Sequence, residues 1–193
     1  MKTADPIKLF RAWFAAARRA GVASPEAMAL ATADRRGRPS VRFVLLKGVD
    51  DRGFVFYTNA DSRKGAELAS NPRASLAIYW QPIARQVRVE GKIEQVTDAE
   101  ADAYWASRPR ESRFAGSVSR QSRTLRSRAD LIARWRRLVR EIGDGEIPRP
   151  RNWTGFRLVP DAIELWRERP HRLHERERFE RARGGWKSRL LDP

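Results

Sequence analysis

Short β-forming runs separated by Asp-x-x-Gly loops constrain the fold of this 193-residue chain more than any other feature of its sequence. Three runs follow one another, at residues 28–32, 40–46 and 54–58, and the loops between them contain Asp34-Arg-Arg-Gly37 and Asp50-Asp-Arg-Gly53. Asp and Gly at such positions are typical of the tight turns that join neighbouring antiparallel strands. The pattern therefore predicts consecutive β-hairpins in this part of the chain.

Helices and further strands complete the expected fold. Asp5-Pro6 is a helix start, because an N-cap carboxylate precedes a Pro in the first turn, and Thr97 with Glu100 forms a capping box. The expected helices are 5–21, 62–70, 97–108 and 129–142, and the further strands are 74–80, 86–94 and, after Trp153, 179–183 and 186–190 around Gly184-Gly185. Strands do not alternate regularly with helices, which argues against a doubly wound sheet.

We therefore expect one domain, residues 1–193, that is mostly antiparallel β with added helices. It would comprise an N-terminal helix within 1–21, a helical insertion at 97–142 and C-terminal strands at 153–193. A chain of this length is long enough to bury a single core.

The composition excludes several classes of protein. The chain has no Cys and only two His, so disulfides, thiolate chemistry and a multi-histidine metal centre are excluded. No apolar run approaches the roughly 20 residues that a membrane helix needs. The first residues lack the apolar core of a secretory signal, so we expect a cytoplasmic protein with no membrane association.

The net charge of +16 and the pI near 11.4 indicate an anionic partner. Nucleic acid is one interpretation, because Lys and Arg bind phosphates by releasing counterions. The charge is spread over the whole chain, however, with no basic tail or low-complexity block. A solvated, Arg-rich exterior is an equally good interpretation.

Two basic clusters surround the second and third β-forming runs. Arg42 and Lys47 flank an apolar run, and their opposite parity places Lys47 beyond the end of a regular strand. Tyr57 and Thr58 end the next run, and Arg63 and Lys64 follow at the start of a helix. Helix N-termini attract anions, so the second cluster predicts an anion site, unless Ser62 merely caps the helix and the cations are exposed.

Two more clusters lie in the second half of the chain. Tyr104 and Arg108 share a helix face, with Ser112 just beyond Pro109, which suits a phosphomonoester, although an exposed helix end would look the same. If 172–176 is a strand, Arg172, His174 and Arg176 share one face opposite Leu173. An exposed polar edge strand is the alternative for that segment.

In this order the clusters resemble the pyridoxamine (pyridoxine) 5′-phosphate oxidase family of flavoproteins, over essentially the whole chain. The resemblance is carried by R-x-V-L-L-K at Arg42–Lys47, F-Y-T-N at Phe56–Asn59, S-R-K at Ser62–Lys64, R-Q-V at Arg85–Val87, S-R-P-R-x-S at Ser107–Ser112, Q-S at Gln121-Ser122 and H-R-L-H-x-R at His171–Arg176. The resemblance implies an FMN-binding split β-barrel that forms a homodimer, with FMN at the subunit interface.

The resemblance also assigns roles to residues. Those implied to hold FMN are Arg42, Tyr57, Thr58, Arg63, Lys64, Gln86, Gln121, Ser122, Trp166 and Arg176. Those implied to bind the substrate phosphate are Lys47, Tyr104, Arg108 and Ser112, while Arg172 and His174 match positions over the substrate ring and are the candidate catalytic residues. No metal site is implied.

The implied reaction is oxidation of pyridoxamine or pyridoxine 5′-phosphate to pyridoxal 5′-phosphate, with oxygen as acceptor and hydrogen peroxide as product. The cofactor carries the difficult chemistry, so the lack of an obvious nucleophile is expected. A related flavin oxidase of the phenazine-pathway type, acting on another ring, is the alternative. A basic nucleic-acid-binding β-barrel is a second, less favoured alternative, because the motifs point to small phosphorylated ligands instead.

The chain departs from the family pattern in three places. Members commonly have Gly-Ala-Trp after S-R-P-R-x-S, where this chain has Ala115-Gly-Ser117, and many have a longer arm before Asp5. The usual ending is Arg-Leu-x-Pro, whereas Arg189 here lies one position early. These departures bear on the range of substrates more than on FMN binding.

Overall fold

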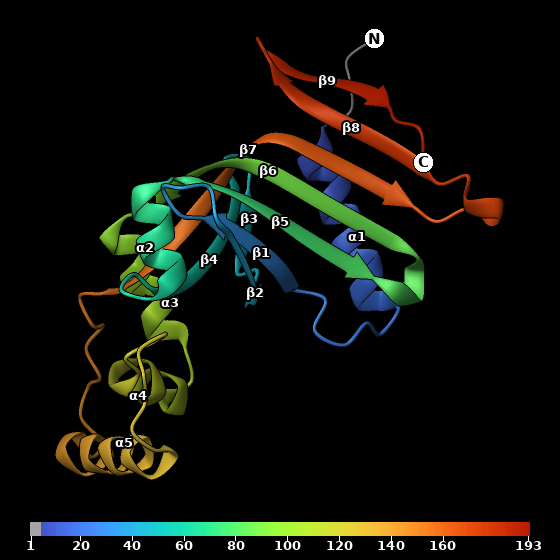
Figure 1. Ribbon diagram of the computed structural model, residues 1–193. Helices are drawn as coiled ribbons and strands as arrows, with labels where there is room; N and C mark the ends of the chain where they lie inside the picture. The colour runs from blue at the N-terminus through green and yellow to red at the C-terminus, as the bar shows by residue number, and fades with distance from the viewer. Residues whose placement is uncertain (1–4) are drawn as a thin grey trace.

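The computed structural model describes residues 5–193, which form one antiparallel sheet of nine strands, curled into a half-barrel (Figure 1). The strands are β1 (Ala27–Ala33), β2 (Pro39–Leu45), β3 (Gly48–Asp50), β4 (Gly53–Asn59), β5 (Arg73–Trp80), β6 (Arg85–Gln95), β7 (Trp153–Arg167), β8 (Glu175–Ala182) and β9 (Gly185–Leu190). The main path runs β2-β1-β5-β6-β7-β4-β3, and β8 and β9 continue from β7. The mostly antiparallel fold predicted from the sequence is confirmed.

One helix packs against this sheet, and the others lie at its margins (Figure 1). The helices are α1 (Pro6–Arg19), α2 (Arg63–Ser70), α3 (Asp98–Ser107), α4 (Arg110–Val118) and α5 (Arg128–Ile142), with single 3₁₀ turns η1 (Gln81–Ile83) and η2 (Pro170–Arg172). In Figure 1, α2 to α5 gather at one end of the sheet, and η2 lies at the other.

The first Asp-x-x-Gly loop closes the predicted hairpin, but the second joins β4 to the short strand β3, which was not predicted, and not to β2. The Asp34 carboxylate accepts the backbone N–H groups of Arg36 and Arg38, at 2.9 and 3.0 Å, and β1 pairs with β2. Asp50 does the same for Arg52 and Gly53 between β3 and β4. Gly53 has φ +151°, and a Cβ there would lie 2.0 Å from the carbonyl oxygen of Leu158, so this turn requires glycine.

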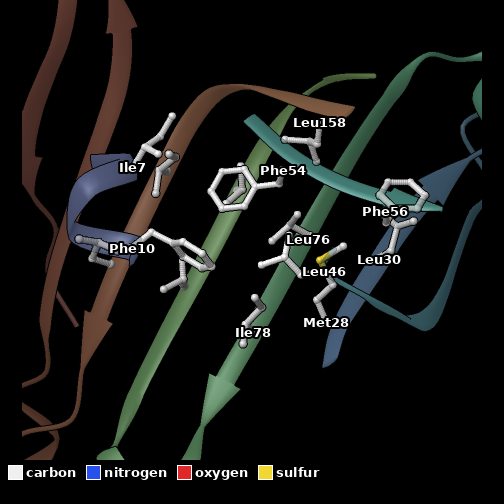
Figure 2. Packing of buried hydrophobic residues seen from close by; sticks show 14 of the residues in the cluster. Ile7, Phe10, Met28, Leu30, Leu46, Phe54, Phe56, Leu76, Ile78 and Leu158 are labelled. Atoms are coloured by element: carbon white, nitrogen blue, oxygen red, sulfur yellow. The ribbon is translucent and has the colours of Figure 1, made fainter. Parts of the chain in front are cut away.

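The main core lies where α1 packs against the sheet (Figure 2). Ile7, Phe10 and Ala17 recur on one side of α1 and are buried there. The Phe10 ring meets Phe54 edge-on, with centroids 4.9 Å apart, and lies 5.8 Å from Trp80. Burying each such side chain contributes about 1.5–3 kcal/mol to the free energy of folding. These contacts therefore hold α1 against the sheet.

The helix starts follow the capping chemistry of the sequence. The Asp5 side chain accepts the N–H of Ile7 and caps α1. At α3, Thr97 and Glu100 make the reciprocal hydrogen bonds of a capping box. These local signals were sufficient to predict where α1 and α3 begin.

The helix α4 was not predicted from the sequence. Pro109 ends α3, as expected, but it also serves as the N-cap of a new helix that carries Ser112. Phe114 of α4 is buried and meets Trp135 of α5, with ring centroids 6.4 Å apart. This packing between α4 and α5 stabilises α4.

The conditional prediction of a strand through residues 172–176 is wrong. Pro170 begins η2, and His171 and Arg172 have φ of +57° and +62°, which is left-handed backbone. The strand β8 begins only at Glu175. Arg172 and His174 therefore do not share a strand face with Arg176.

Residues 1–4 of the expected N-terminal segment lie outside the described residues. Within 5–193, no helix combines the length and the apolar character needed to cross a membrane.

Candidate functional site

A cavity of about 590 Å³ opens at the end of the sheet where α2, α3 and α4 gather. Its walls come from β2, from the end of β4, from these helices and from the segment after α4. The predicted site residues that line it are Arg42, Lys47, Tyr57, Thr58, Lys64, Tyr104, Arg108, Ser112 and Gln121. β2 ends at Leu45, so Lys47 reaches the cavity from beyond the strand, as the parity argument predicts.

Lys64 is a buried cation on one side of this cavity. Its Nζ donates to Thr58 Oγ1 at 2.9 Å, to Gln121 Oε1 at 2.7 Å and to Ser62 Oγ at 3.3 Å. These partners are neutral, and no carboxylate pairs with Lys64 within residues 5–193. Burial, with a smaller effect from the charge of Arg42, lowers the pKa of Lys64 from 10.5 to about 8. An anion bound here would supply the missing counter-charge.

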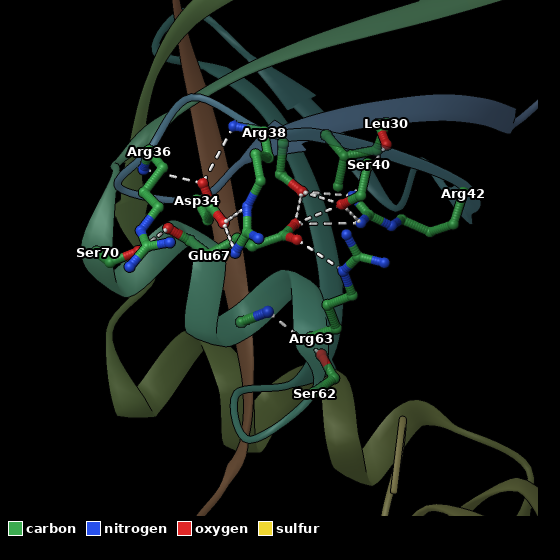
Figure 3. Close-up of polar contacts among 12 residues, drawn as sticks. Leu30, Asp34, Arg36, Arg38, Ser40, Arg42, Ser62, Arg63, Glu67 and Ser70 are labelled. Carbon is green, nitrogen blue, oxygen red and sulfur yellow. Dashed lines mark hydrogen bonds and ion pairs between the residues drawn. The ribbon is translucent and has the colours of Figure 1, made fainter.

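Arg42 is held in place by a network of hydrogen bonds to residues of β1, β2 and α2 (Figure 3). Its Nη1 donates to the Leu30 carbonyl oxygen at 3.1 Å and to Thr32 Oγ1 at 2.6 Å. Its Nη2 donates to Ser40 Oγ and, at 3.3 Å, to Glu67 Oε2. Both terminal nitrogens of the guanidinium are therefore occupied by the protein.

The carboxylate of Glu67, on α2, is the centre of this network. It accepts hydrogen bonds from Thr32, from Ser40 at 2.6 Å and from Arg63 Nε at 2.8 Å. Burial alone would raise the pKa of Glu67, but these hydrogen bonds and the Arg42 charge outweigh it and lower the pKa to about 2. Glu67 is therefore ionised at any physiological pH.

Arg108 is a second, half-buried cation of the cavity. Its guanidinium lies over two indole rings that are in contact with each other, 5.0 Å from the centroid of Trp105 and 4.9 Å from that of Trp153. Burial lowers the pKa of Arg108. Its Nη1 is buried without a hydrogen-bond partner among residues 5–193. Because an unpaired buried donor is costly, this nitrogen is suited to a ligand anion.

Three nearly parallel aromatic rings, those of Tyr57, Tyr104 and Trp153, stack together beside Arg108. Tyr57 stacks on Tyr104, with centroids 4.0 Å apart and planes 17° apart, and lies 5.4 Å from Trp153 at 8°. Burial, and secondarily the Glu100 charge, raises the pKa of Tyr57, so its phenol stays neutral. Sequence analysis missed Trp153, because only the folded chain brings the start of β7 to Arg108.

A second group of predicted residues lies at the opposite end of β6 and β7. Gln86 pairs with Trp166, and Trp166 pairs with Arg176 of β8. The rings of Trp166 and His174 are 4.7 Å apart, and Arg172 lies in η2 between the two strands. Trp153 is the first residue of β7, and Trp166 is the last but one. A strand rises about 3.3 Å per residue, so the two groups are on the order of 40 Å apart along β7.

The single chain thus does not bring all the predicted residues together. Two more lie next to the cavity without lining it: Arg63 borders a neighbouring cleft, and Ser122 lies in the loop after α4 with φ +68°. His174 Nδ1 accepts the N–H of Arg169 at 3.3 Å. Arg176 Nε donates to Glu164 Oε1 at 2.9 Å.

The edge strand β2 exposes apolar side chains beside the cavity. Val41, Phe43 and Leu45 point outward, and Phe43 is 77% exposed. Phe43 and Leu45 also line the cavity. An exposed apolar edge at the mouth of a site favours contact with another protein surface.

Models of known families match most of the chain. Residues 14–138 match the family described as pyridoxamine 5′-phosphate oxidase. Residues 153–193 match the pyridoxine 5′-phosphate oxidase C-terminal dimerisation region.

Similar curated proteins and solved structures agree. The pyridoxine/pyridoxamine 5′-phosphate oxidases of Gluconobacter oxydans and Novosphingobium aromaticivorans are both 52% identical, cover 98% of this chain and are themselves covered to 95% and 94%. PhzG from Burkholderia lata 383, solved with tetrahydrophenazine-1-carboxylic acid, matches with a TM-score of 0.94 at 37% identity, over 99% of this chain and 94% of that one. A pyridoxamine 5′-phosphate oxidase-related, FMN-binding protein from Nostoc punctiforme shares the fold, with a TM-score of 0.79 at 17% identity over 100% of both chains.

Proposed function

The chain belongs to the pyridoxamine 5′-phosphate oxidase family, and from that premise we propose that it oxidises pyridoxamine or pyridoxine 5′-phosphate to pyridoxal 5′-phosphate with FMN. Oxygen is the electron acceptor in this proposal, and hydrogen peroxide is the second product. The observation that carries the proposal is the presence in one cavity of two cations without a counter-charge, the buried Lys64 and the half-buried Arg108, whose Nη1 is buried. FMN and the substrate each bring one phosphate, so the reaction needs two anion sites.

The surroundings of Lys64 fit a flavin phosphate. The buried ammonium has three neutral partners and lacks a counter-charge, which a phosphate would provide. The residues that would hold FMN from this side are Arg42, Tyr57, Thr58, Arg63, Lys64, Gln121 and Ser122. Bound FMN would supply the hydride acceptor for the reaction and pass the electrons to oxygen.

The surroundings of Arg108 fit the substrate phosphate. The unpartnered Nη1 and the planar guanidinium would donate to phosphate oxygens, and Lys47, Tyr104 and Ser112 also line the cavity. These four residues would fix one end of the substrate, and the stacked rings beside them would keep water away. Holding the substrate in one orientation is the main contribution that this chain makes to the rate.

We further propose that two copies of the chain complete each site. Five of the predicted residues lie at the opposite end of β6 and β7, too far away to serve the cavity of their own chain. They are Gln86, Trp166, Arg172, His174 and Arg176. In a homodimer, they would serve the cavity of the other copy, where Arg172 would position the substrate ring with help from His174. The exposed apolar edge of β2 and the match to a dimerisation region support this arrangement.

A second candidate is oxidation of a tricyclic carboxylate, because PhzG matches this chain so closely in structure. Such a substrate has no phosphate. Arg108 and its neighbours would then bind the carboxylate of the substrate, and the enzyme would not depend on a substrate phosphate.

Turnover of the purified protein distinguishes the candidates. We expect yellow protein that releases FMN on denaturation and forms pyridoxal 5′-phosphate and peroxide in equal amounts from pyridoxamine 5′-phosphate. Flavoprotein that turns over only a dihydro- or tetrahydrophenazine carboxylate would favour the second candidate. Colourless protein that refuses FMN but shifts labelled RNA would contradict both.

A further inference from the structure

We infer that Glu67 is a positioning residue: its buried carboxylate orients Arg42 and Arg63 for a bound flavin phosphate. The inference rests on the proposed function, because it assumes that this phosphate binds at the start of α2. Glu67 belongs to none of the sequence motifs. It is nevertheless only 6% exposed and contacts both arginines, which come from different elements.

The contacts of Glu67 decide which donors the two arginines keep. Oε1 engages the Nε of Arg63, which leaves both terminal nitrogens of that guanidinium without a partner among residues 5–193. An Arg has five N–H donors, so four remain on a side chain that is 65% exposed. Oε2 engages Nη2 of Arg42, whose terminal nitrogens are fully used, and only its Nε–H remains.

The carboxylate is itself fixed from the opposite direction. Thr32 of β1 and Ser40 of β2 donate to the same Oε2 atom, which ties α2 to the first hairpin (Figure 3). Without these contacts, the long side chains of Arg42 and Arg63 would sample many rotamers. Binding an anion would then have to order both of them.

Charge and orientation predict opposite effects at this position. A carboxylate close to a phosphate repels it, so if Glu67 acted through its charge alone, removing it would strengthen FMN binding. If Glu67 orients the arginines, removing it weakens FMN binding, because the two side chains are then disordered before FMN binds and FMN must order them. The sign of the change therefore tests the inference.

The experiment compares FMN with riboflavin, which lacks the phosphate, by quenching of flavin fluorescence on apoprotein. We expect Glu67→Ala to raise the FMN dissociation constant roughly tenfold, as ordering of two long side chains implies, with riboflavin binding unchanged. Glu67→Gln retains the shape but places an amide donor near Arg42, so we expect a smaller loss in the same direction. Asp34→Asn is the matched control, since Asp34 pairs with Arg38 on the same hairpin without touching either arginine.

The outcomes separate the inference from the proposed function. Unchanged or tighter FMN binding by the Glu67 variants overturns the positioning role, and so does an equal loss of FMN and riboflavin. If Glu67→Ala does not fold, as judged by its thermal unfolding, the same criteria apply to Glu67→Gln. Wild-type protein that binds no FMN refutes the proposed function and removes the basis of the inference.

Discussion

Binding of FMN should weaken as the pH rises above 8, because Lys64 then loses its proton. In the empty site, burial holds the pKa of Lys64 at about 8, against 10.5 for an ordinary lysine. A bound phosphate would stabilise the ammonium and return its pKa towards the ordinary value, so binding above pH 8 requires uptake of one proton. The FMN dissociation constant should then rise roughly thirtyfold between about pH 7 and 9.5.

The stability of the apoprotein should change in the opposite direction. The unfolded chain keeps its Lys64 proton up to about pH 10.5, whereas the folded chain releases it above 8. The unfolded state thus binds more protons in this window, and the free energy of unfolding rises with pH. The cost of burying the charged form is fully present below pH 8.

Fluorescence titration of apoprotein across this range measures the effect. The second pKa of the FMN phosphate is about 6, so the phosphate is almost fully ionised throughout this pH range. Lys64→Arg, which stays charged, should show no such rise, and riboflavin should bind to the wild type with little dependence on pH. A flat profile for wild-type FMN binding, or the same slope in Lys64→Arg, would refute the assignment of Lys64 to the phosphate.

Three further predictions concern the substrate site, the dimer and the core. Arg108→Lys keeps a charge without the planar fork, so KM for pyridoxamine 5′-phosphate should rise about tenfold or more with a smaller change in kcat; an unchanged KM in steady-state assays would contradict this. Phe43→Glu places a charge on the exposed β2 edge and should give monomers with little FMN in analytical ultracentrifugation, whereas a stable FMN-loaded dimer would count against the interface. Phe10→Ala should lower the free energy of unfolding by about 3–5 kcal/mol in urea titrations, since it removes a fully buried ring; a loss below 1 kcal/mol would show that α1 contributes little to the core.

Features set by neighbouring residues could be predicted from the sequence. The turns at Asp34 and Asp50 and the capping box at Thr97 depend on side chains that bond to backbone a few residues away. The placement of Lys47 beyond β2 followed from strand parity alone. Each of these depends on chemistry within a window of a few residues, which the sequence states directly.

Features set by distant residues could not be predicted. The helix α4 depends on contact between Phe114 and Trp135, and the left-handed turn at His171 interrupts what alternation suggested was a strand. The contact of Trp153 with Arg108 joins residues from different elements, and so does that of Glu67 with Arg42. Sequence motifs identify such residues individually but carry no information on which side chains meet.

The positions of the motif residues on the sheet could not be predicted from the sequence either. The motifs group Gln86 and Arg176 with Lys64 as residues that hold one cofactor. The structure puts Lys64 at one end of the sheet and the other two at the far end of β6 and β8. We propose that a second chain reconciles these positions, and this separation is the physical basis of the proposed dimer.

Anaerobic reduction of the bound flavin tests the central claim most directly. The FMN-loaded protein is mixed with pyridoxamine 5′-phosphate in the absence of oxygen, and the visible absorbance of the flavin is followed. We predict complete bleaching by the phosphorylated substrate, one pyridoxal 5′-phosphate formed per flavin, and little bleaching by unphosphorylated pyridoxine at the same concentration. FMN-loaded protein that stays oxidised with pyridoxamine and pyridoxine 5′-phosphate, or that bleaches only with a reduced phenazine carboxylate, would contradict the claim.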